Sequence, residues 1–399
     1  MFNRQFWISR IESAWKIRPL IWLSGVRRVG KTTLAHQISN AHYINCDLPS
    51  EIRGMTDPES FLDKFPKGSR VVLDEIHRLD DPSRLLKIAA DVYPHLRIMA
   101  TGSSTLAATK KFKDSLTGRK ISIHLPPVLW PECVQDAEIT NISRRFLNGG
   151  LPQQLLASHR DPSLFSEWLD SFYARDVQEL FNVRNRTGFI KLLQLLLRQS
   201  GGALNIGTMA AECEISRPTA ISYLEALVLS HAIILVRPFH GGSKREIIQQ
   251  PRCYGFDTGF VCHEKGWDSL RRDDHGILWE HLVLDTLQTC FGDDRVFYWR
   301  DKEDHEIDFI ILEKRDAITA VECKINPDKF RPENLARFRT KYPFGNNWVI
   351  SPLVKTVFKK RFDNLTVEFL PLEYLGKLSP DSIPGLNNAV VASKKQPRN

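Results

Sequence analysis

Short apolar runs alternate with longer amphipathic segments over the first part of the chain. The apolar runs have the length of β-strands and lie at residues 20–23, 43–47, 70–74, 96–101 and 120–125. Strands that alternate with helices are typical of a parallel sheet covered by helices. The pattern therefore predicts an α/β domain over residues 1–151.

The pattern becomes helical after GGLP at residues 149–152, a turn signal that we take as the end of the sheet domain. EWLDSFYARDVQELF and FIKLLQLLLRQS are the clearest amphipathic segments that follow. Two short helices, a longer one over 217–229, a strand and the basic turn HGGSKREI then predict a winged helix. Residues 152–246 are thus expected to form a helical and winged-helix domain.

The last third of the chain again mixes a long helix, at 276–291, with strands at 296–300, 306–312 and 318–325. This pattern predicts a second α/β domain over residues 247–380. The polar tail, 381–399, is expected to be disordered.

Composition narrows the class of protein. The chain has 399 residues, 42% of them hydrophobic, which is enough for two or three cores, and its net charge of +8 favours an anionic partner such as nucleic acid. The seven cysteines form no CxxC pair, so neither a zinc cluster nor a disulfide framework is indicated. We find no signal peptide, and Glu225, Ser230 and His231 interrupt the longest apolar stretch. We expect a cytoplasmic protein without a membrane segment.

The segment GVRRVGKT, at residues 25–32, has the residues of a phosphate-binding loop. Gly25 and Gly30 allow backbone amides to wrap phosphates, Lys31 would reach the β and γ phosphates, and the Thr32 hydroxyl would bind magnesium. A strand precedes the loop and a helix follows it, whose N-terminus favours an anion. The sequence predicts an ATP and Mg²⁺ site rather than a fortuitous glycine turn, with two further loop members, Arg28 and Thr33.

An acidic strand, VVLDEIH, follows at 71–77. Asp74 would lie near the magnesium and Glu75 would polarise the attacking water. The alternative is a carboxylate pair that caps the next helix. ATGSS ends the following strand, so Ser103 or Ser104 would position the water or sense the γ phosphate, unless these residues only form a turn.

In their order along the chain, GVRRVGKTT, YINCDLP, VVLDEIHRL, ATGSS, LTGRK and RDV resemble motifs of the prokaryotic AAA-type ATPases that carry an uncharacterised, nuclease-like C-terminal domain. The resemblance covers about residues 15–370. It implies the Walker and sensor roles for Lys31, Thr32, Asp74, Glu75 and Ser103 or Ser104. It also implies that Arg119 or Arg175 could act as an arginine finger towards a neighbouring subunit, with ATP between the subunits of an oligomer. A structural salt bridge is the alternative for each arginine.

A winged helix would offer a recognition helix at 217–229 and a wing at 240–245. Its basic residues Arg217, Lys244 and Arg245 would face backbone phosphates of DNA. A packing or dimerisation module is the alternative.

In AVECKIN, Glu322 and Lys324 are two residues apart and lie on one face of a strand. Asp308 precedes them by a hairpin-length interval, and Glu280 lies on the helix before. The set resembles the PD-(D/E)xK nuclease superfamily, which implies that Asp308 and Glu322 hold a divalent metal, Glu280 supports it and Lys324 orients or activates water. The alternative is an ion pair between Lys324 and a carboxylate, in a domain that binds DNA or assembles without cleaving.

Three functions fit these features. The leading one is an ATP-hydrolysing, oligomeric AAA-type ATPase that binds or remodels DNA, branched DNA included. The second is an ATP-gated, metal-dependent DNA nuclease in defence or repair. The third is a nucleotide-controlled signalling or assembly switch that does not touch DNA. ATP and Mg²⁺ are the expected cofactors, and DNA and further copies of the chain are the expected partners.

Overall fold

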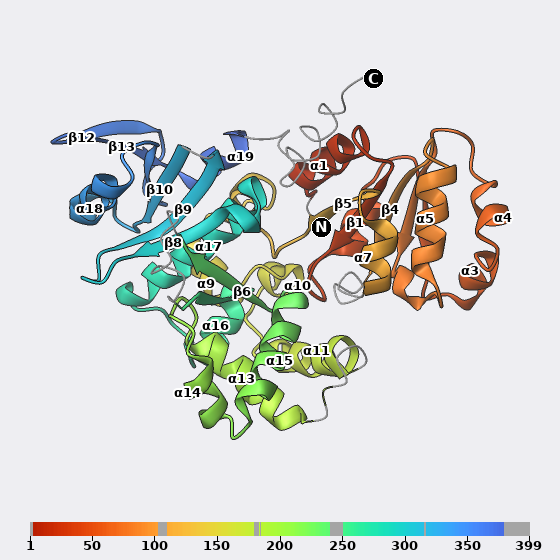
Figure 1. The fold of residues 1–399 in the computed structure, drawn as a ribbon, viewed down its shortest axis with the longest axis horizontal. Coiled ribbons are helices and arrows are strands. Elements are labelled where there is room, and N and C mark those ends of the chain that lie inside the picture. The colour runs from red at the N-terminus through yellow and green to blue at the C-terminus, as the bar shows by residue number, and fades with distance from the viewer. Residues whose placement is uncertain are drawn as a thin grey trace, which may run out of the picture. The chain divides into compact units, whose positions relative to one another are not determined.

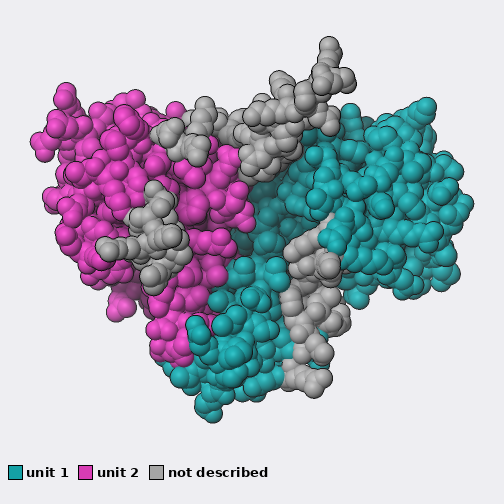
Figure 2. Space-filling view, viewed as in Figure 1, with its two compact units in different colours: residues 1–128, 150–193, 210–233 teal, residues 129–149, 194–209, 234–399 magenta. Residues whose placement is uncertain are grey.

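A computed structural model of the chain describes residues 3–102, 110–178, 183, 185–239, 250–314 and 317–378. The chain divides into two compact units (Figure 2). The first comprises residues 1–128, 150–193 and 210–233, and the second 129–149, 194–209 and 234–399. The predicted tail at 381–399 lies outside the described residues. Within the described part of the chain, no helix is long and apolar enough to cross a bilayer.

The first unit contains a five-stranded sheet with the order β2-β3-β4-β1-β5, and every pair of neighbouring strands is parallel (Figure 1). Its strands are β1 (Leu20–Ser24), β2 (Ala41–Asn45), β3 (Arg70–Asp74), β4 (Arg97–Thr101) and β5 (Lys120–His124). Strand β1 is buried at every position, as expected when helices cover both faces of a parallel sheet. The predicted parallel α/β sheet is confirmed.

The first unit also contains α1 (Gln5–Trp15), α2 (Lys31–His36), α3 (Pro49–Gly54), α4 (Pro58–Leu62), the 3₁₀ turn η1 (Ile76–Arg78), α5 (Pro82–Val92), α7 (Lys110–Leu116), α10 (Pro152–Leu156), α11 (Ser163–Phe172) and the π turn η2 (Tyr173–Val177). Helix α5 begins where the Asp81 side chain accepts a hydrogen bond from the Arg84 backbone and Pro82 follows in the first turn. Its apolar face packs into a core that includes Trp22, Leu73 and Phe112.

The second unit contains an eight-stranded mixed sheet with the order β12-β13-β11-β10-β9-β8-β6-β7. Its strands are β6 (Ile233–Pro238), β7 (Arg252–Gly255), β8 (Val296–Arg300), β9 (Glu306–Lys314), β10 (Ala317–Cys323), β11 (Asn347–Ile350), β12 (Phe358–Phe362) and β13 (Leu365–Leu370). Strand β9 is antiparallel to β8 and β10, whereas β11 is parallel to β10 and β13. The sequence therefore predicted the second α/β domain correctly at the level of its class.

The helical elements of this unit include the long helix α17 (His275–Phe291), whose Trp279 Nε1 donates to the Ile350 carbonyl at 2.9 Å. The others are α8 (Trp130–Gln135), α9 (Ile142–Asn148), α16 (Thr258–Glu264), η4 (Arg272–Asp274), η5 (Asp293–Arg295), η6 (Pro327–Lys329), α18 (Glu333–Lys341), η7 (Leu372–Tyr374) and α19 (Leu375–Leu378).

The segment expected to form the winged helix contains one short helix, α14 (Ile206–Glu212), before the longer α15 (Arg217–Leu229), whereas two short helices were predicted. Helix α13 (Arg186–Arg198) precedes this segment. Ser216 caps α15, because its Oγ accepts a hydrogen bond from the Thr219 backbone at 3.2 Å. Strands β6 and β7 follow, but they are strands of the eight-stranded sheet, and Arg237 on β6 pairs with Phe297 on β8. The expected wing at 240–245 lies outside the described residues.

Candidate functional site

The loop between β1 and α2 has a backbone that requires glycine at two positions. Gly25 has φ of 155°, and a Cβ there would lie 2.5 Å from the Leu125 carbonyl oxygen. Gly30 has φ of 99° and immediately precedes α2. L-residues rarely adopt such angles, so both glycines fit the close approach of backbone that a phosphate-binding loop needs.

Lys31, the first residue of α2, lies over this loop. Its Nζ donates to the Gly25 carbonyl at 2.9 Å and to the Val26 carbonyl at 3.2 Å. The ammonium group is thus held where it can exchange carbonyl oxygens for phosphate oxygens.

At the carboxyl end of the sheet, Asp74 accepts hydrogen bonds from hydroxyl groups of three elements. Its Oδ2 accepts hydrogen bonds from Thr32 Oγ1 at 2.7 Å and from Tyr43 Oη at 2.7 Å, and its Oδ1 accepts one from Thr101 Oγ1. Burial, together with this hydrogen bond to Asp74, raises the pKa of Tyr43, so the phenol keeps its proton. Hydroxyl and carboxylate oxygens are the donors that Mg²⁺ prefers, so Thr32 and Asp74 fit the expected ion.

Glu75 follows directly, with the left-handed φ of 57°, and its backbone N–H donates to Thr101 Oγ1 at 3.0 Å. His77 Nδ1 lies 3.1 Å from Glu75 Oε2. Burial acts to raise the pKa of Glu75, but the contact with His77 and the positive charges of Lys31 and Arg27 outweigh it and lower that pKa. The carboxylate is therefore ionised at neutral pH, as a base must be.

A pocket of about 410 Å³ adjoins the phosphate-binding loop. Its walls are formed by Gly30 and Thr33 from the loop and α2, by Arg4 from the N-terminal segment, and by Pro152, Gln153, Leu156 and Ala157. Pro152, the last residue of the GGLP segment that the sequence indicated only as a domain boundary, therefore lines a pocket beside the loop. Its volume is within the range of roughly 300–1,000 Å³ usual for small-molecule sites.

Other residues predicted from the sequence have partners elsewhere, are exposed, or lie outside the described residues. Arg119 Nε lies 2.6 Å from Asp91 Oδ1, so its guanidinium group already has an acidic partner within the chain. Arg28 NH1 lies 3.9 Å from Glu167. Arg175 belongs to the π turn, but its side chain is not among those described, and Arg217 is exposed at the start of α15. Ser103, Ser104, Lys244 and Arg245 lie outside the described residues.

A second cluster of charged side chains lies in the second unit. Asp308 on β9 and Glu322 on β10 converge on Lys324, whose Nζ is 2.6 Å from Glu322 Oε2 and 3.5 Å from Asp308 Oδ2. Asp308 also accepts a hydrogen bond from the Cys323 backbone at 2.7 Å. These partners offset the free-energy cost of burying the Asp308 carboxylate. The apolar neighbours of Asp308 on its own strand could not offset this cost.

Glu280 on α17 joins this cluster through residues that the sequence did not reveal. Tyr254 Oη donates to Glu280 Oε2 at 3.2 Å, and Arg252 lies between Glu280, 3.9 Å away, and Glu306. Burial first, and the Asp308 charge second, raise the pKa of Glu280 to about 8.

Glu322 is affected in the same way, because burial and then the Asp308 charge raise its pKa to about 8. Burial acts to lower the pKa of Lys324, but Asp308 and Glu322 outweigh it and raise that pKa, so the ammonium stays charged. The cluster thus combines two glutamates, whose pKa values are raised, with a lysine that stays charged.

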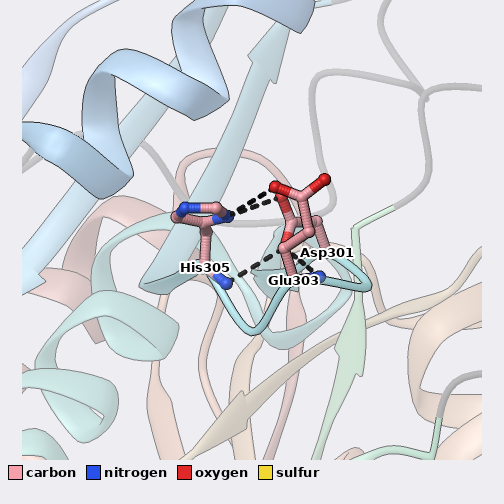
Figure 3. A group of neighbouring side chains, drawn as sticks. All are labelled: Asp301, Glu303 and His305. Carbon is pink, nitrogen blue, oxygen red and sulfur yellow. Dashed lines mark hydrogen bonds and ion pairs between the residues drawn. The ribbon is translucent and has the colours of Figure 1, made fainter.

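A different group of potential metal ligands, Asp301, Glu303 and His305, lies in the turn between β8 and β9 (Figure 3), with ligand atoms within 4.8 Å of one another. Among the described residues, no other His, Cys, Asp and Glu side chains form such a group, so Glu280, Asp308 and Glu322 are spread around Lys324. Asp301 Oδ1 accepts hydrogen bonds from the backbone of Glu303 at 2.9 Å and of His305 at 3.0 Å. Arg337 adds a cation 3.5 Å from Asp301. These contacts explain the turn without a metal.

Three residues of the first site were also missed. Tyr43, Thr101 and His77 all belong to motifs noted in the sequence, YINCDLP, ATGSS and VVLDEIH, but their side chains became meaningful only when β2, β3 and β4 were placed side by side.

Comparison with known families agrees with this geometry. Residues 17–134, which include the five-stranded sheet and its loop, match the AAA domain family. Two further families, DUF8612 and DUF4143, match residues 139–271 and 275–375, and both are described as domains of unknown function.

Among individual proteins, the chain is 25% identical over 323 residues to the uncharacterized protein Rv2008c of Mycobacterium tuberculosis, which covers 78% of this chain and 71% of that protein. It is 24% identical over 361 residues to the uncharacterized protein MJ1544 of Methanocaldococcus jannaschii, covering 82% and 78%.

Among solved structures, the Walker-type ATPase PABY2304 of Pyrococcus abyssi aligns with a TM-score of 0.42 at 16% identity and covers 66% of this chain and 96% of that one. ORC1 of Aeropyrum pernix in complex with DNA aligns with a TM-score of 0.31 at 11% identity and covers 67% and 93%.

Proposed function

We propose that the first unit binds ATP with Mg²⁺ and hydrolyses it. The observation that carries this proposal is the 2.7 Å contact between Thr32 Oγ1 and Asp74 Oδ2, beside Lys31 and Glu75. A hydroxyl and a carboxylate from distant parts of the sequence meet here, and metal-assisted phosphoryl transfer uses such a pair to hold the ion. The match of residues 17–134 to the AAA domain family supports it.

Each part of the nucleotide has a partner in this proposal. The base and ribose occupy the pocket of about 410 Å³ beside Pro152 and Leu156, and Lys31 contacts the β and γ phosphates. Mg²⁺, held by Thr32 and Asp74, would neutralise charge on the phosphate oxygens. Glu75 accepts a proton from the attacking water.

The test is Lys31→Ala, with ATP binding measured by a fluorescent analogue and hydrolysis by phosphate release. Nucleotide affinity should fall by at least roughly tenfold, because the ammonium group that contacts two phosphates is lost. Lys16→Ala, which changes an exposed lysine outside the loop, is the control and should leave both quantities unchanged. Hydrolysis at the parent rate in Lys31→Ala would remove this loop from the reaction.

The AAA-type ATPase is further proposed to form an oligomer and to bind or remodel DNA. Support comes from the exposed Arg217 at the start of α15 and from the net charge of +8. Fluorescence anisotropy with single-stranded, duplex and branched DNA, in each nucleotide state and over a series of salt concentrations, tests this. Salt-sensitive binding is expected. If no DNA binds in any state while ATP drives assembly, the protein is an assembly switch instead.

A second candidate function, metal-dependent DNA cleavage, is favoured by the convergence of Asp308 and Glu322 on Lys324. Asp308 and Glu322 would hold a divalent metal, Glu280 would support it, and Lys324 would orient water. Cutting in Mg²⁺ or Mn²⁺ should disappear in Asp308→Ala and persist in Asp293→Ala, an exposed aspartate of the same unit. Cutting that survives Asp308→Ala comes from another source.

A further inference from the structure

Strand β12 forms one edge of the eight-stranded sheet, where, among the residues that the structure describes, it pairs only with β13 (Figure 1). Residues 355–361 are all exposed. This stretch includes the cations Lys355, Lys359, Lys360 and Arg361. An unpaired strand edge that is this basic favours an anionic occupant.

Phe358 stands out on this edge because it is large, apolar and 45% exposed. Its ring stacks on Phe369 with centroids 4.7 Å apart and planes only 2° from parallel. Phe369 is buried, so the exposed side of the Phe358 ring is the side that faces away from it. An aromatic face beside cations is the combination by which proteins bind single-stranded nucleic acid.

The acidic groups around this edge do not cancel its charge. Lys359 Nζ pairs with Glu368 at 2.6 Å, and Arg361 Nε donates to the Asp363 carbonyl at 3.0 Å, an uncharged acceptor. Lys360 Nζ lies 5.2 Å from the centre of the Phe362 ring. Lysines on an edge strand also prevent pairing between sheets. That role explains the charges but not the exposed ring.

The register of the sheet connects this edge with the carboxylate cluster. Glu322 pairs with Val349, Val349 with Phe369, and Phe369 with Phe358. Residues that pair directly lie on the same face of a sheet, and three strand spacings amount to about 14 Å. The β12 edge is thus about 14 Å from Glu322 along these paired residues, with the buried Val349 and Phe369 between them.

We propose that the β12 edge binds single-stranded nucleic acid, with a base stacked on Phe358 and backbone phosphates at Lys360 and Arg361. The β12 edge belongs to the second unit, whereas the ATP site and Arg217 belong to the first, so this proposal does not rest on the function proposed for either.

The test is binding of a fluorescein-labelled oligothymidylate to the full chain without nucleotide. Phe358→Ala and Phe358→Leu should each weaken binding by roughly 5- to 100-fold, because a stacked base loses its aromatic platform. The leucine variant keeps apolar packing on Phe369, and Phe358→Trp should retain binding. Phe344→Ala removes another exposed phenylalanine and serves as the matched control.

Lys360→Glu should lower the salt dependence of binding by about one unit of slope or more, whereas Lys302→Glu, on another exposed turn, should not. Unchanged binding in both Phe358→Ala and Phe358→Leu would overturn the proposal. Displacement of the oligothymidylate by polyglutamate at equal charge concentration would also overturn it. The proposal would also be overturned if Lys360→Glu bound the oligothymidylate as the parent does but began to self-associate. The lysines would then serve only to prevent pairing between the edges of two sheets. Loss of binding in Arg217→Glu alone would support the winged helix instead.

Discussion

At the scale of single residues, Glu75 is separated from Asp74 by one peptide bond yet has a different set of partners. Asp74 accepts hydroxyl groups from three elements, whereas Glu75 faces His77, Lys31 and Arg27. The first arrangement suits a metal and the second a base. This separation of roles leads to a prediction for each carboxylate.

Glu75→Gln should retain ATP but lose turnover by roughly 10²- to 10⁴-fold, because an amide cannot accept the proton of the attacking water. Equilibrium binding of the nucleotide and its steady-state hydrolysis measure the two effects separately. Glu59→Gln, an exposed glutamate of α4, is the control. Turnover at the parent rate in the glutamine variant would remove Glu75 from the reaction.

Asp74→Asn should leave the fold intact and reduce the response of hydrolysis to Mg²⁺. The amide has nearly the same shape, but its NH₂ group faces the Thr32 or Tyr43 hydroxyl and it carries no charge for the ion. A Mg²⁺ titration of hydrolysis should show a midpoint raised by roughly tenfold or more, since each lost charged contact is worth about 1.5–3 kcal/mol. A midpoint equal to that of the parent would contradict the metal role.

Asp285 in α17 predicts a pH dependence of stability. Burial raises its pKa to about 7, although Arg145 acts to lower it. The folded state therefore binds a proton that the unfolded state releases near pH 4, and stability falls as pH rises from about 4 to about 7. Relative to the parent, Asp285→Asn should gain roughly 2–4 kcal/mol between pH 4 and pH 8, at about 1.4 kcal/mol per pKa unit. Urea unfolding at both pH values measures this, and a difference that does not change with pH would contradict it.

At the scale of elements, a buried arginine of α18 adds hydrogen bonds to the apolar packing of this helix on the second sheet. The Arg339 guanidinium donates to Asn347 Oδ1 and to the carbonyls of Tyr342, Phe344, Ile318 and Asn346. Burial lowers its pKa to about 10, so it remains charged at neutral pH. Arg339→Ala should cost about 3–5 kcal/mol of unfolding free energy, because buried carbonyls lose their donors.

Arg337 provides a matched control on the same helix, because its side chain is 51% exposed and pairs with Asp301 and Glu303 at the surface. Arg337→Ala should cost less than about 1 kcal/mol. Equal effects of the two substitutions in urea unfolding of the full chain would mean that Arg339 does not anchor the helix.

The sequence predicted elements well where a repeating apolar pattern or a cap marks them. Strand β3 and helix α15 have the expected bounds, Arg70–Asp74 and Arg217–Leu229. Strand β2 ends at Asn45 rather than at residue 47, because Asn45 Oδ1 accepts from the Asp47 backbone and turns the chain. Strand β12 was not predicted, since FKKRF is exposed almost throughout and has no buried alternation.

The sites show the same limit. Motif spacing located Lys31, Asp74 and Glu75. It also predicted Asp308 and Glu322 on adjacent strands, whereas Lys324, expected on the same strand as Glu322, lies one residue beyond the end of β10. Spacing could not indicate Arg252 or Tyr254. Both lie on β7, and their partner Glu280 lies on α17, which comes later in the chain. Contacts of that kind depend on how the strands are ordered, and the order of the eight-stranded sheet does not follow the sequence.

At the scale of the whole molecule, the proposed oligomer can be tested by mixing two inactive variants. If ATP lies between subunits, one subunit supplies Glu75 and its neighbour supplies an arginine finger. When the two variants are mixed, a subunit with Arg175→Ala still has an intact Glu75. A neighbouring subunit with Glu75→Gln still has an intact Arg175, so the site between them has both groups. In a ring of randomly mixed subunits, roughly one site in four should regain both groups, and hydrolysis should reappear.

The same mixture with Arg119→Ala distinguishes the two arginines. Arg119 already pairs with Asp91 within its own chain, so Arg119→Ala should lower stability modestly and leave hydrolysis largely intact before mixing. Recovery with Arg175→Ala, together with an ATP-dependent increase in mass by sedimentation, would identify Arg175 as the residue acting between subunits. If both arginine variants hydrolyse ATP at the parent rate alone, each ATP site is complete within one chain, and ATP must drive any assembly through a surface other than the site itself.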